Sequence, residues 1–478
     1  MTDSGYAGIL ADAAVRWPDR STLHFEGATW TYGDLHAAVL RASGHLAAAG
    51  VGVGTRVALL IENSPLYLIA QFALARLGAV FVTPNPYWTT RETSHALQAA
   101  RVDWVLHSDG MEPPPDSADA ALPAESLLLA SSSPDAPALR PDPLSHRYIP
   151  FSSGTTGMPK GAVHTDGSLC GAVRQLRHHL ALSESDRIQI ALPLCHIFGT
   201  TMSAAAISVG APITVFRRFD LEESLRHIVD AGVTVWPIAG AMAQRLVERP
   251  DLPDLDLSAL RFFMWGGSAV PPGLARRITA ATGVRFLCSY GMTEAMMVAF
   301  NPVAQPDLWR LDSPGFPTEG TALRLTDAGE LEVRGPSVAA GYAGVRSEAF
   351  TPDGWFRTGD LAHIDDDGRV TIVDRIKDMI KVSGFQVSPV EVESALSEHP
   401  DVAEAGVVGR PDARDGEAPV AFVVSRAVVT EQALTQHLST RLATYKRPRE
   451  YRFVDALPRT VGGKLRRRAL AEWANDVS

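Results

Sequence analysis

Apolar and polar positions along the first third of the chain change repeatedly between a helical and a strand-like period. Apolar residues recur at helical spacing over residues 31–50 and 66–78, and the first pattern closes at Gly50. A buried strand is predicted at 57–63, and further strands at 79–85 and 102–108. Because strands and helices follow each other in turn, the pattern predicts a parallel sheet covered by helices.

The remainder of the chain first resumes this rhythm and then loses it. Residues 110–146, rich in Pro, Ala, Ser and Asp, are predicted to be a surface connection. Apolar runs then predict further strands at 188–194, 212–219, 233–238, 260–265 and 284–290. Short runs between Gly and Asp turns over 314–373 predict a small antiparallel β unit. Residues 376–478 are predicted to be α+β, with strands at 405–410 and 420–425 and helices near 389–398 and 430–443.

Length and charge narrow the class of protein. A chain of 478 residues is too long for one ordinary core and implies two or three domains, with a boundary near Asp374–Lys377. The net charge of −10 argues against nucleic acid as the main partner. The most apolar window, residues 66–83, is interrupted by Gln71 and Arg76, so it predicts a buried helix and strand and no membrane span.

The cysteines and the N-terminal residues bear on the cellular compartment. Cys170, Cys195 and Cys288 are odd in number, far apart and without metal-ligand spacing, so we expect free or buried thiols in a reducing compartment. The first residues contain no basic segment followed by an apolar run, and no signal peptide is predicted. A cytoplasmic protein is therefore expected.

Lysine is used sparingly in this chain. Lys and Arg total 44, and the lysines among them are Lys160, Lys377, Lys381, Lys446 and Lys464. A lysine ammonium is a compact, mobile point charge, and arginine does not replace it where such a charge must reach a reacting group. Any one lysine could survive by chance, so the informative question is whether all of them lie in segments that carry chemistry.

The segment FSSGTTGMPKGAVH, residues 151–164, has the composition of an anion-binding loop. Its glycines let backbone N–H groups converge, and its hydroxyls and ammonium add donors; the residues are Ser152, Ser153, Gly154, Thr155, Thr156, Gly157, Lys160 and Gly161. Such a set of donors suits a polyphosphate. No Ser or Thr follows a Gly-Lys pair, so the segment is not a Walker A loop. The alternative is an ordinary glycine-rich hairpin turn.

Two other segments carry weaker signals when taken alone. In SYGMTEA, residues 289–295, Tyr290 offers a flat face for a base, and Glu294 offers the hard oxygen that magnesium prefers. The alternative is that Thr293 is only a helix N-cap. In GWFRTGDLA, residues 354–362, Asp360 either accepts hydrogen bonds from two ribose hydroxyls or bonds its own backbone.

Taken together, the motifs resemble those of the adenylate-forming superfamily, and are most similar to acyl- and aryl-CoA ligases of the 4-coumarate–CoA ligase type. The motifs, which occur in family order, are FSSGTTGMPKG, PLCHIFG, SYGMTE, WFRTGD, DRIKDMIKVSGFQVSP and LPRTVGGKLRRR. The resemblance extends from about residue 22 to residue 470. It implies an α/β fold in which residues 1–374 form a large domain of doubly wound sheets plus a small β-barrel unit. Residues 375–478 would form a small, mobile α+β domain.

The resemblance also implies where ATP and magnesium bind. The loop around Lys160 would hold the β- and γ-phosphates, and Thr293 would bond the α-phosphate. Glu294, with Thr155, would hold magnesium. Adenine would lie between the ring of Tyr290, which is followed by Gly291, and the backbone of Gly266, Gly267 and Ser268. Asp360 and Arg375 would bind the ribose.

The lysines of the C-terminal region acquire roles from the same resemblance. Lys464 would contact the substrate carboxylate and the α-phosphate while the acyl-adenylate forms and pyrophosphate leaves. The C-terminal domain would then rotate about Lys377. Rotation would bring Lys381 and the Ser383–Gly384 segment to the site where the acyl group passes to the thiol of CoA. All the lysines thus lie in motif segments, although for Lys446 only a structural role is expected.

The carboxylic acid is expected to be a small aryl or short acyl acid. His196 resembles the family histidine that borders the acyl site, with a buried core histidine as the alternative. Residues 191–203 contain no acidic side chain that could pair with an ammonium group, which disfavours an α-amino acid. Trp265, Met296 and Met297 would shorten an apolar pocket if they point inward; otherwise Trp265 packs at a strand end.

The sequence does not decide which molecule accepts the activated acyl group. CoA is implied by the resemblance, but the phosphopantetheine of an acyl carrier protein presents the same thiol. A second function is therefore a stand-alone adenylating enzyme that loads a carrier protein or forms an amide or N–N bond in a biosynthetic pathway. A luciferase-like oxygenase is the least favoured reading of the motifs.

Overall fold

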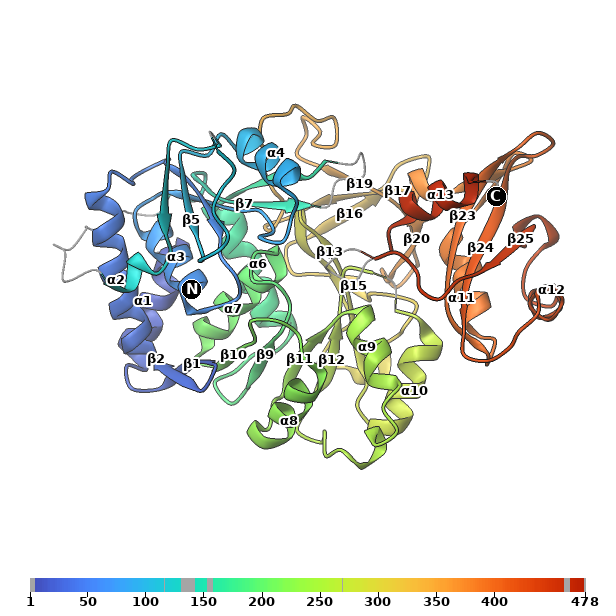
Figure 1. Cartoon of the computed structure of the whole chain (residues 1–478), viewed down its shortest axis with the longest axis horizontal. Coiled ribbons are helices and arrows are strands. Elements are labelled where there is room, and N and C mark those ends of the chain that lie inside the picture. The colour runs from blue at the N-terminus through green and yellow to red at the C-terminus, as the bar shows by residue number, and fades with distance from the viewer. Residues whose placement is uncertain are drawn as a thin grey trace.

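Two mixed β-sheets form the larger part of the molecule (Figure 1). The computed structural model describes residues 5–115, 117–129, 142–152, 158–268, 270–459 and 465–476. In the first sheet the strand order is β15 (Phe316–Pro317), β14 (Ala295–Phe300), β13 (Phe286–Met292), β12 (Phe262–Trp265), β11 (Val235–Ile238), β9 (Ile188–Ile190), β10 (Ile213–Val215), β1 (Ser21–Phe25), β2 (Ala28–Thr31). In the second it is β18 (Gly341–Tyr342), β8 (Lys160–Thr165), β7 (His146–Ser152), β4 (Val80–Thr83), β3 (Arg56–Leu60), β5 (Trp104–His107), β6 (Ala120–Pro123).

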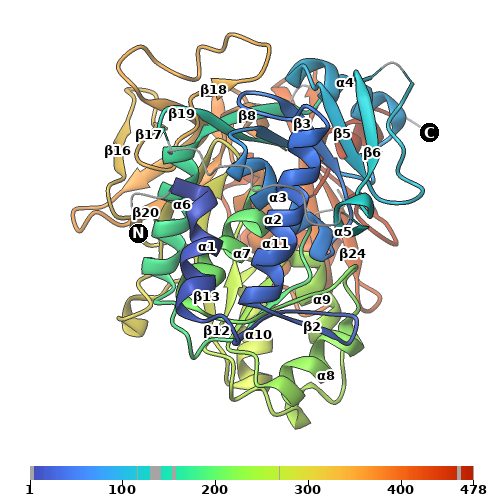
Figure 2. The same cartoon turned by 90° about the vertical axis from the view of Figure 1, so that its left-hand side faces the viewer.

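Helices cover both faces of each sheet. The core between the sheets is shared by α1 (Gly5–Arg16), α2 (Tyr32–Ala48), α3 (Pro65–Arg76), α6 (Asp166–His179) and α7 (Ile197–Val209), which Figure 2 shows from the side. The outer face of the first sheet packs against α8 (Leu221–Ala231), α9 (Gly240–Val247) and α10 (Pro272–Thr282). The outer face of the second packs against α4 (Thr90–Ala100).

This layering explains why the strands appear in the sequence as continuous apolar runs. In β3, Val57 and Leu59 pack into the core between the sheets, while Ala58 and Leu60 pack into the core under α4. Successive side chains of a strand point to opposite faces, so a strand that is buried on both faces has no polar positions to alternate with.

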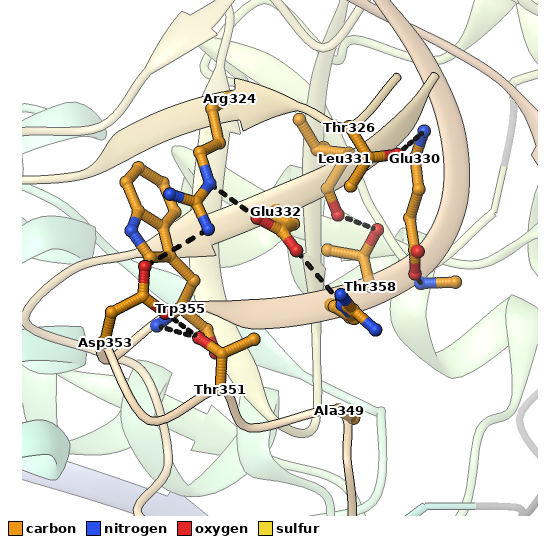
Figure 3. A network of polar contacts seen from close by, with 12 residues as sticks. Arg324, Thr326, Glu330, Leu331, Glu332, Ala349, Thr351, Asp353, Trp355 and Thr358 are labelled. Carbon is orange, nitrogen blue, oxygen red and sulfur yellow. Dashed lines mark hydrogen bonds and ion pairs between the residues drawn. The ribbon is translucent and has the colours of Figure 1, made fainter. Parts of the chain in front are cut away.

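A smaller antiparallel sheet forms the β unit predicted over 314–373. Its strand order is β16 (Ala322–Leu325), β17 (Glu330–Arg334), β19 (Phe356–Ile364), β20 (Val370–Arg375). Figure 3 shows the polar contacts that join these strands. Glu332 on β17 accepts hydrogen bonds from Nε of Arg324 at 2.5 Å and Nε of Arg357 at 3.1 Å, and its side chain is only 3% exposed. The Thr358 hydroxyl donates to the Leu331 carbonyl at 2.8 Å, which fixes the segment that leads to Asp360.

Glu332→Gln is expected to lower the free energy of unfolding by about 1–2 kcal/mol at neutral pH, between the values typical of exposed and of buried ion pairs. Burial on its own raises the pKa of the Glu332 carboxyl, but the hydrogen bonds from Arg324 and Arg357 outweigh it and leave the pKa below its ordinary value. A carboxyl whose pKa is lower in the folded state stabilises the fold above its unfolded-state pKa, and this stabilisation is lost as the pH falls through the folded-state value.

Urea unfolding of the wild type and Glu332→Gln at neutral and acidic pH checks this expectation. The difference between the two proteins should shrink as the pH drops below the ordinary glutamate range. Glu348→Gln, at an exposed position of the same unit, is the control. A difference that stays constant down to acidic pH would contradict the role assigned to the Glu332 charge.

The last hundred residues form a separate sheet (Figure 1). Its strands are β21 (Ile380–Val382), β22 (Phe385–Val387), β23 (Val402–Asp412), β24 (Gly416–Ser425) and β25 (Glu450–Phe453). On β23, Val407 packs on the side of α11 (Pro389–Ser397) and α12 (Glu431–Ser439), while Val408 packs on the side of α13 (Arg467–Asn475). The sheet is therefore covered by helices on both faces.

The predicted fold class is confirmed, with one correction to the elements. The connection predicted over 110–146 contains structure: β6 pairs in parallel with β5 at the sheet edge, and α5 (Ser126–Leu129) follows it. The run AALP of β6 is too short and too poor in β-branched residues to be distinguished from a loop in the sequence. Residues 116 and 130–141 lie outside the described ones. In the part of the chain that is described, no helix is long and apolar enough to cross a membrane.

The domain boundary and the rotation of the C-terminal domain stay predictions. β20 ends at Arg375, and the next sheet begins at Ile380. The segment between them contains Lys377, whose side chain is about half exposed and whose ammonium lies 3.9 Å from Asp378.

Candidate active site

Several of the predicted site residues follow the carboxyl ends of parallel strands. β9, β11, β12 and β13 run parallel, with Ile238 opposite Trp265 and Trp265 opposite Cys288. Their carboxyl ends therefore meet at one edge of the sheet, which is where open α/β sheets place ligands. The segments that contain His196 and residues 266–268 leave the sheet at this edge, while residues 290–294 extend β13 beyond its parallel pairing with β12, which ends at Cys288.

Thr293 and Glu294 form the tight turn of a β-hairpin. Met292 of β13 pairs with Ala295 of β14, which leaves these two residues as the loop. The alternative that Thr293 caps a helix is therefore wrong. Both side chains are buried, at 6% and 8% exposure. Gly291 is required next to this turn, because an added Cβ would lie 1.9 Å from the Met296 carbonyl oxygen.

The Glu294 carboxylate is held from the second sheet. The Tyr342 hydroxyl of β18 donates to Oε1 of Glu294 at 2.7 Å, and the Lys160 ammonium lies 5.6 Å from the centre of the Tyr342 ring. Burial, and then the charge of Glu294, raises the pKa of Tyr342. One buried carboxylate fits a magnesium ion that takes its other ligands from phosphates and water. Thr155, the other predicted magnesium ligand, lies outside the described residues.

Asp360 lies in contact with the predicted adenine and ribose residues. The Tyr290 hydroxyl donates to Oδ2 of Asp360, and Nε of Arg375 lies 2.6 Å from Oδ1. Asp360 and Arg375 face each other on β19 and β20. Burial, followed by the charge of Asp360, raises the pKa of Tyr290 well above its usual value. The side chains predicted to meet adenine and ribose are thus joined at one carboxylate.

The glycine-rich segment after β12 is packed closely against β13. An added Cβ at Gly266 would lie 2.9 Å from the Ser289 hydroxyl oxygen, and Gly267 has a φ of 79° that favours glycine. The Trp265 indole donates to the Ser268 carbonyl at 2.9 Å. These contacts set the course of the backbone on which adenine was predicted to lie.

The predicted pocket residues differ in where their side chains lie. Trp265 is 1% exposed and packs with Phe286 in the core under α8–α10, which supports strand-end packing over the inward-pointing alternative. Met296 and Met297 belong to the core between the sheets, so their role as a pocket wall stays a prediction. His196 is exposed at the start of α7, and its Nδ1 accepts from the Phe198 N–H at 3.4 Å. The alternative of a buried core histidine is therefore wrong.

Lys381 lies on a hairpin in the C-terminal domain. Ser383 and Gly384 form the turn between β21 and β22, with φ values of 49° and 83°. Two successive positive φ values indicate a type I′ turn. Lys381 is exposed, its backbone N–H donates to the Glu417 carboxylate at 2.6 Å, and the Ser383 hydroxyl donates to Asp415.

Part of the predicted phosphate site lies outside the described residues. These residues are Ser153, Gly154, Thr155, Thr156, Gly157 and Lys464. The flanking residues are described: Ser152 ends β7 and Lys160 begins β8, and the two pair in an antiparallel hairpin. Lys160 thus begins the strand that pairs with β18, from which Tyr342 contacts Glu294.

Two residues beside the site were missed by the sequence analysis. Tyr342 contacts Glu294 directly, and His164 donates from Nε2 to the Thr293 carbonyl at 2.8 Å. Burial lowers the pKa of His164 to about 4, so it is neutral near physiological pH. A signal for His164 was present: it follows Lys160 by four positions on a strand, which places both side chains on one face.

The fold and the site define an enzyme that transfers adenylate to an acid. The family model described as "AMP-binding enzyme" matches residues 10–343, and its companion for the C-terminal domain of AMP-binding enzymes matches residues 391–464. The chain belongs to the AMP-binding enzyme family. Within it, the chain is an AMP-forming acid–thiol ligase of the acyl- and aryl-CoA ligase type, which confirms the predicted class.

Several relatives match over nearly the whole chain. A feruloyl-CoA synthase from Amycolatopsis sp. is 34% identical, with 97% of this chain and 98% of the relative covered. A 2-succinylbenzoate–CoA ligase from Bacillus licheniformis is 32% identical, covering 96% and 98%. The solved structure of the anthranilate CoA ligase AuaEII with anthranoyl-AMP has a TM-score of 0.90 at 26% identity and covers 100% of both chains. A structure of the Bacillus subtilis o-succinylbenzoate coenzyme A synthetase, 29% identical with a TM-score of 0.86 and covering 97% and 99%, contains ATP and magnesium.

Proposed function

We propose that this enzyme activates a small aryl or short acyl carboxylic acid with ATP and transfers the acyl group to the thiol of CoA. The observation that carries the proposal is the convergence of two groups of side chains at the edge of the first sheet. One group joins Tyr290, Asp360 and Arg375, and the other joins Glu294 to Tyr342 beside Lys160.

Each group of side chains would bind a different part of ATP. Tyr290 would stack on adenine while Asp360 and Arg375 take the ribose, and Thr293 would bond the α-phosphate. Lys160 and the loop residues before it would bind the β- and γ-phosphates. Magnesium bound by Glu294 would neutralise phosphate charge. The protein's contribution to such a reaction is mainly positioning and charge stabilisation.

The two half-reactions follow from the chemistry of a carboxylate, which is a poor electrophile. In the first, a carboxylate oxygen bonds to the α-phosphorus and pyrophosphate leaves. Lys464 would stabilise the charge that develops there. In the second, the thiol sulfur bonds to the carbonyl carbon, AMP leaves and the thiol proton is released. Lys381 and the Ser383–Gly384 turn would be present at this step.

The preference for a small aryl or short acyl acid rests on the sequence around His196 and on the relatives. No acidic side chain occurs over residues 191–203 to pair with an α-ammonium group. The feruloyl-CoA synthase and the anthranilate CoA ligase are named for aryl acids. His196, exposed where α7 begins, would border the acyl group.

ATP–pyrophosphate exchange over a panel of aryl, short acyl, fatty and α-amino acids tests the proposal. We expect exchange with small aryl or short acyl acids and none with α-amino acids. Addition of CoA should then yield the thioester. If ATP binds but no carboxylic acid supports exchange, the proposed function is wrong. If exchange occurs but CoA yields no thioester while a phosphopantetheinylated carrier protein is acylated, the carrier-loading alternative replaces the CoA step.

A further inference from the structure

We propose that Tyr342 and His164 are positioning residues that fix the Thr293–Glu294 turn in the place where it binds MgATP. This inference rests on the proposed function, because it assigns Glu294 to the metal and Thr293 to the nucleotide. Neither Tyr342 nor His164 need touch the reacting atoms. Their role is to hold the turn from the opposite sheet.

The second sheet presents these two side chains on one face. Lys160, Ala162 and His164 alternate along β8, so their side chains point to the same side. Tyr342 of β18 pairs directly with Ala162, which places its side chain on that side as well. The face that holds the turn is thus the same face from which Lys160 extends.

The contacts to the turn are made at three separate acceptors. The Thr293 carbonyl accepts from Nε2 of His164 at 2.8 Å, and the Glu294 carbonyl accepts from the Ala339 N–H at 2.8 Å. Oε1 of Glu294 accepts from the Tyr342 hydroxyl at 2.7 Å. The first two bonds fix the backbone of the turn, and the third fixes the direction of the carboxylate.

His164 is itself held in a single orientation. A carbonyl can only accept, so Nε2 carries the proton; Nδ1 is then an acceptor 3.2 Å from the Ser168 hydroxyl, whose one proton also points toward the Thr165 carbonyl at 3.2 Å. Ser168 lies in the first turn of α6, where its N–H donates to the side chain of Thr165, the N-cap. The imidazole therefore links the start of α6 to the turn 129 residues further along the chain.

The Tyr342 hydroxyl should matter mainly for magnesium. Loss of a partner that orients a metal ligand typically costs about 10–100-fold in metal affinity. We therefore expect Tyr342→Phe to raise the Mg²⁺ concentration needed for half-maximal ATP binding by at least about 10-fold. ATP binding measured in EDTA should change little, because the phenyl ring still packs below Lys160.

Calorimetric titration of ATP at a series of Mg²⁺ concentrations measures this directly and does not depend on turnover. Tyr451→Phe is the control, since Tyr451, like Tyr342, has a hydrogen-bonded hydroxyl but lies on β25 of the C-terminal domain. An unchanged Mg²⁺ dependence in Tyr342→Phe overturns the proposal. So does an equal shift in Tyr451→Phe, which would indicate general loosening of the fold.

A pair of His164 variants tests the backbone contact. His164→Gln keeps an N–H donor near the position of Nε2, whereas His164→Leu removes it at similar volume. We expect the Leu variant to raise the KM for MgATP about 10-fold or more, and the Gln variant to recover most of the loss. Thermal unfolding of both variants separates this effect from instability. If both variants bind MgATP equally well, or equally poorly at equal thermal stability, the Thr293 contact does not position the turn. Failure of the proposed function is distinct, since it would appear as the lack of acid-dependent exchange in the wild type.

Discussion

Lys464→Ala is expected to slow acid-dependent ATP–pyrophosphate exchange at least about 10²-fold, the typical cost of removing one donor that stabilises transition-state charge. The family resemblance implies that the Lys464 ammonium lies between the substrate carboxylate and the α-phosphate. Both groups carry negative charge as the new P–O bond forms. Arginine would not restore the rate, because a planar guanidinium is bulkier and less mobile than an ammonium. Initial rates of exchange with the best acid of the panel provide the measurement.

Measuring each half-reaction separately in Lys464→Ala and Lys381→Ala shows whether Lys464 acts in adenylation alone. Thioester formation from a chemically prepared acyl-adenylate and CoA should be retained in Lys464→Ala, because that step no longer needs the adenylation lysine. Lys381→Ala should show the reverse pattern, with exchange retained and thioester formation slowed. If both variants lose both half-reactions equally, the assignment of the two lysines to separate conformations is wrong.

Gly291→Ala is the substitution expected to damage the site most through its backbone. The added methyl carbon would lie 1.9 Å from the Met296 carbonyl oxygen, a contact with backbone that no side-chain rotation relieves. The hairpin must open, and overpacking of this kind costs about 1–3 kcal/mol of unfolding free energy. Because the turn contains Thr293 and Glu294, exchange activity should also fall by at least about 10-fold.

Urea unfolding and exchange assays on the same preparations measure both effects. Gly52→Ala is the matched control, since an added Cβ there has nothing within 4 Å and its φ is not in the positive region. A Gly291→Ala protein with wild-type stability and activity would show that the hairpin can shift without consequence for the turn.

Much of the fold could be predicted from the chain because burial on both sheet faces leaves a strong apolar signal. Residues 57–60 of β3 are all apolar, and α2 begins where Thr31 and Asp34 form a capping box. The weakly patterned β6 was missed. The turn at Thr293 could not be distinguished from a helix N-cap, because the choice between them depends on the pairing of Met292 with Ala295.

Site residues could be predicted from the sequence only where they lie in a recognisable motif. Tyr290 and Asp360 lie in short glycine-containing segments with recognisable order, and the structure brings them into contact. Tyr342 follows Gly341 in a two-residue strand whose meaning depends on pairing with β8, far away in the sequence. Neither periodicity nor spacing reveals such a contact. For Trp265 the sequence left open whether the side chain lines a pocket or packs at a strand end, and its burial in the core under α8–α10 supports packing.

The long sequence separations within the site have a consequence for how the protein is made. His164 meets Thr293 across 129 residues, and Tyr290 meets Asp360 across 70. Contacts between residues so far apart in the sequence form late in folding, because a large chain loop must close before such a contact can stabilise the fold. A nascent chain whose synthesis has stopped before Tyr342 has both main sheets largely complete and yet lacks the hydroxyl that orients Glu294. On the proposed site, which includes Arg375, full MgATP binding requires most of the chain to have been made, and bound MgATP would report that the N-terminal domain has reached its native arrangement.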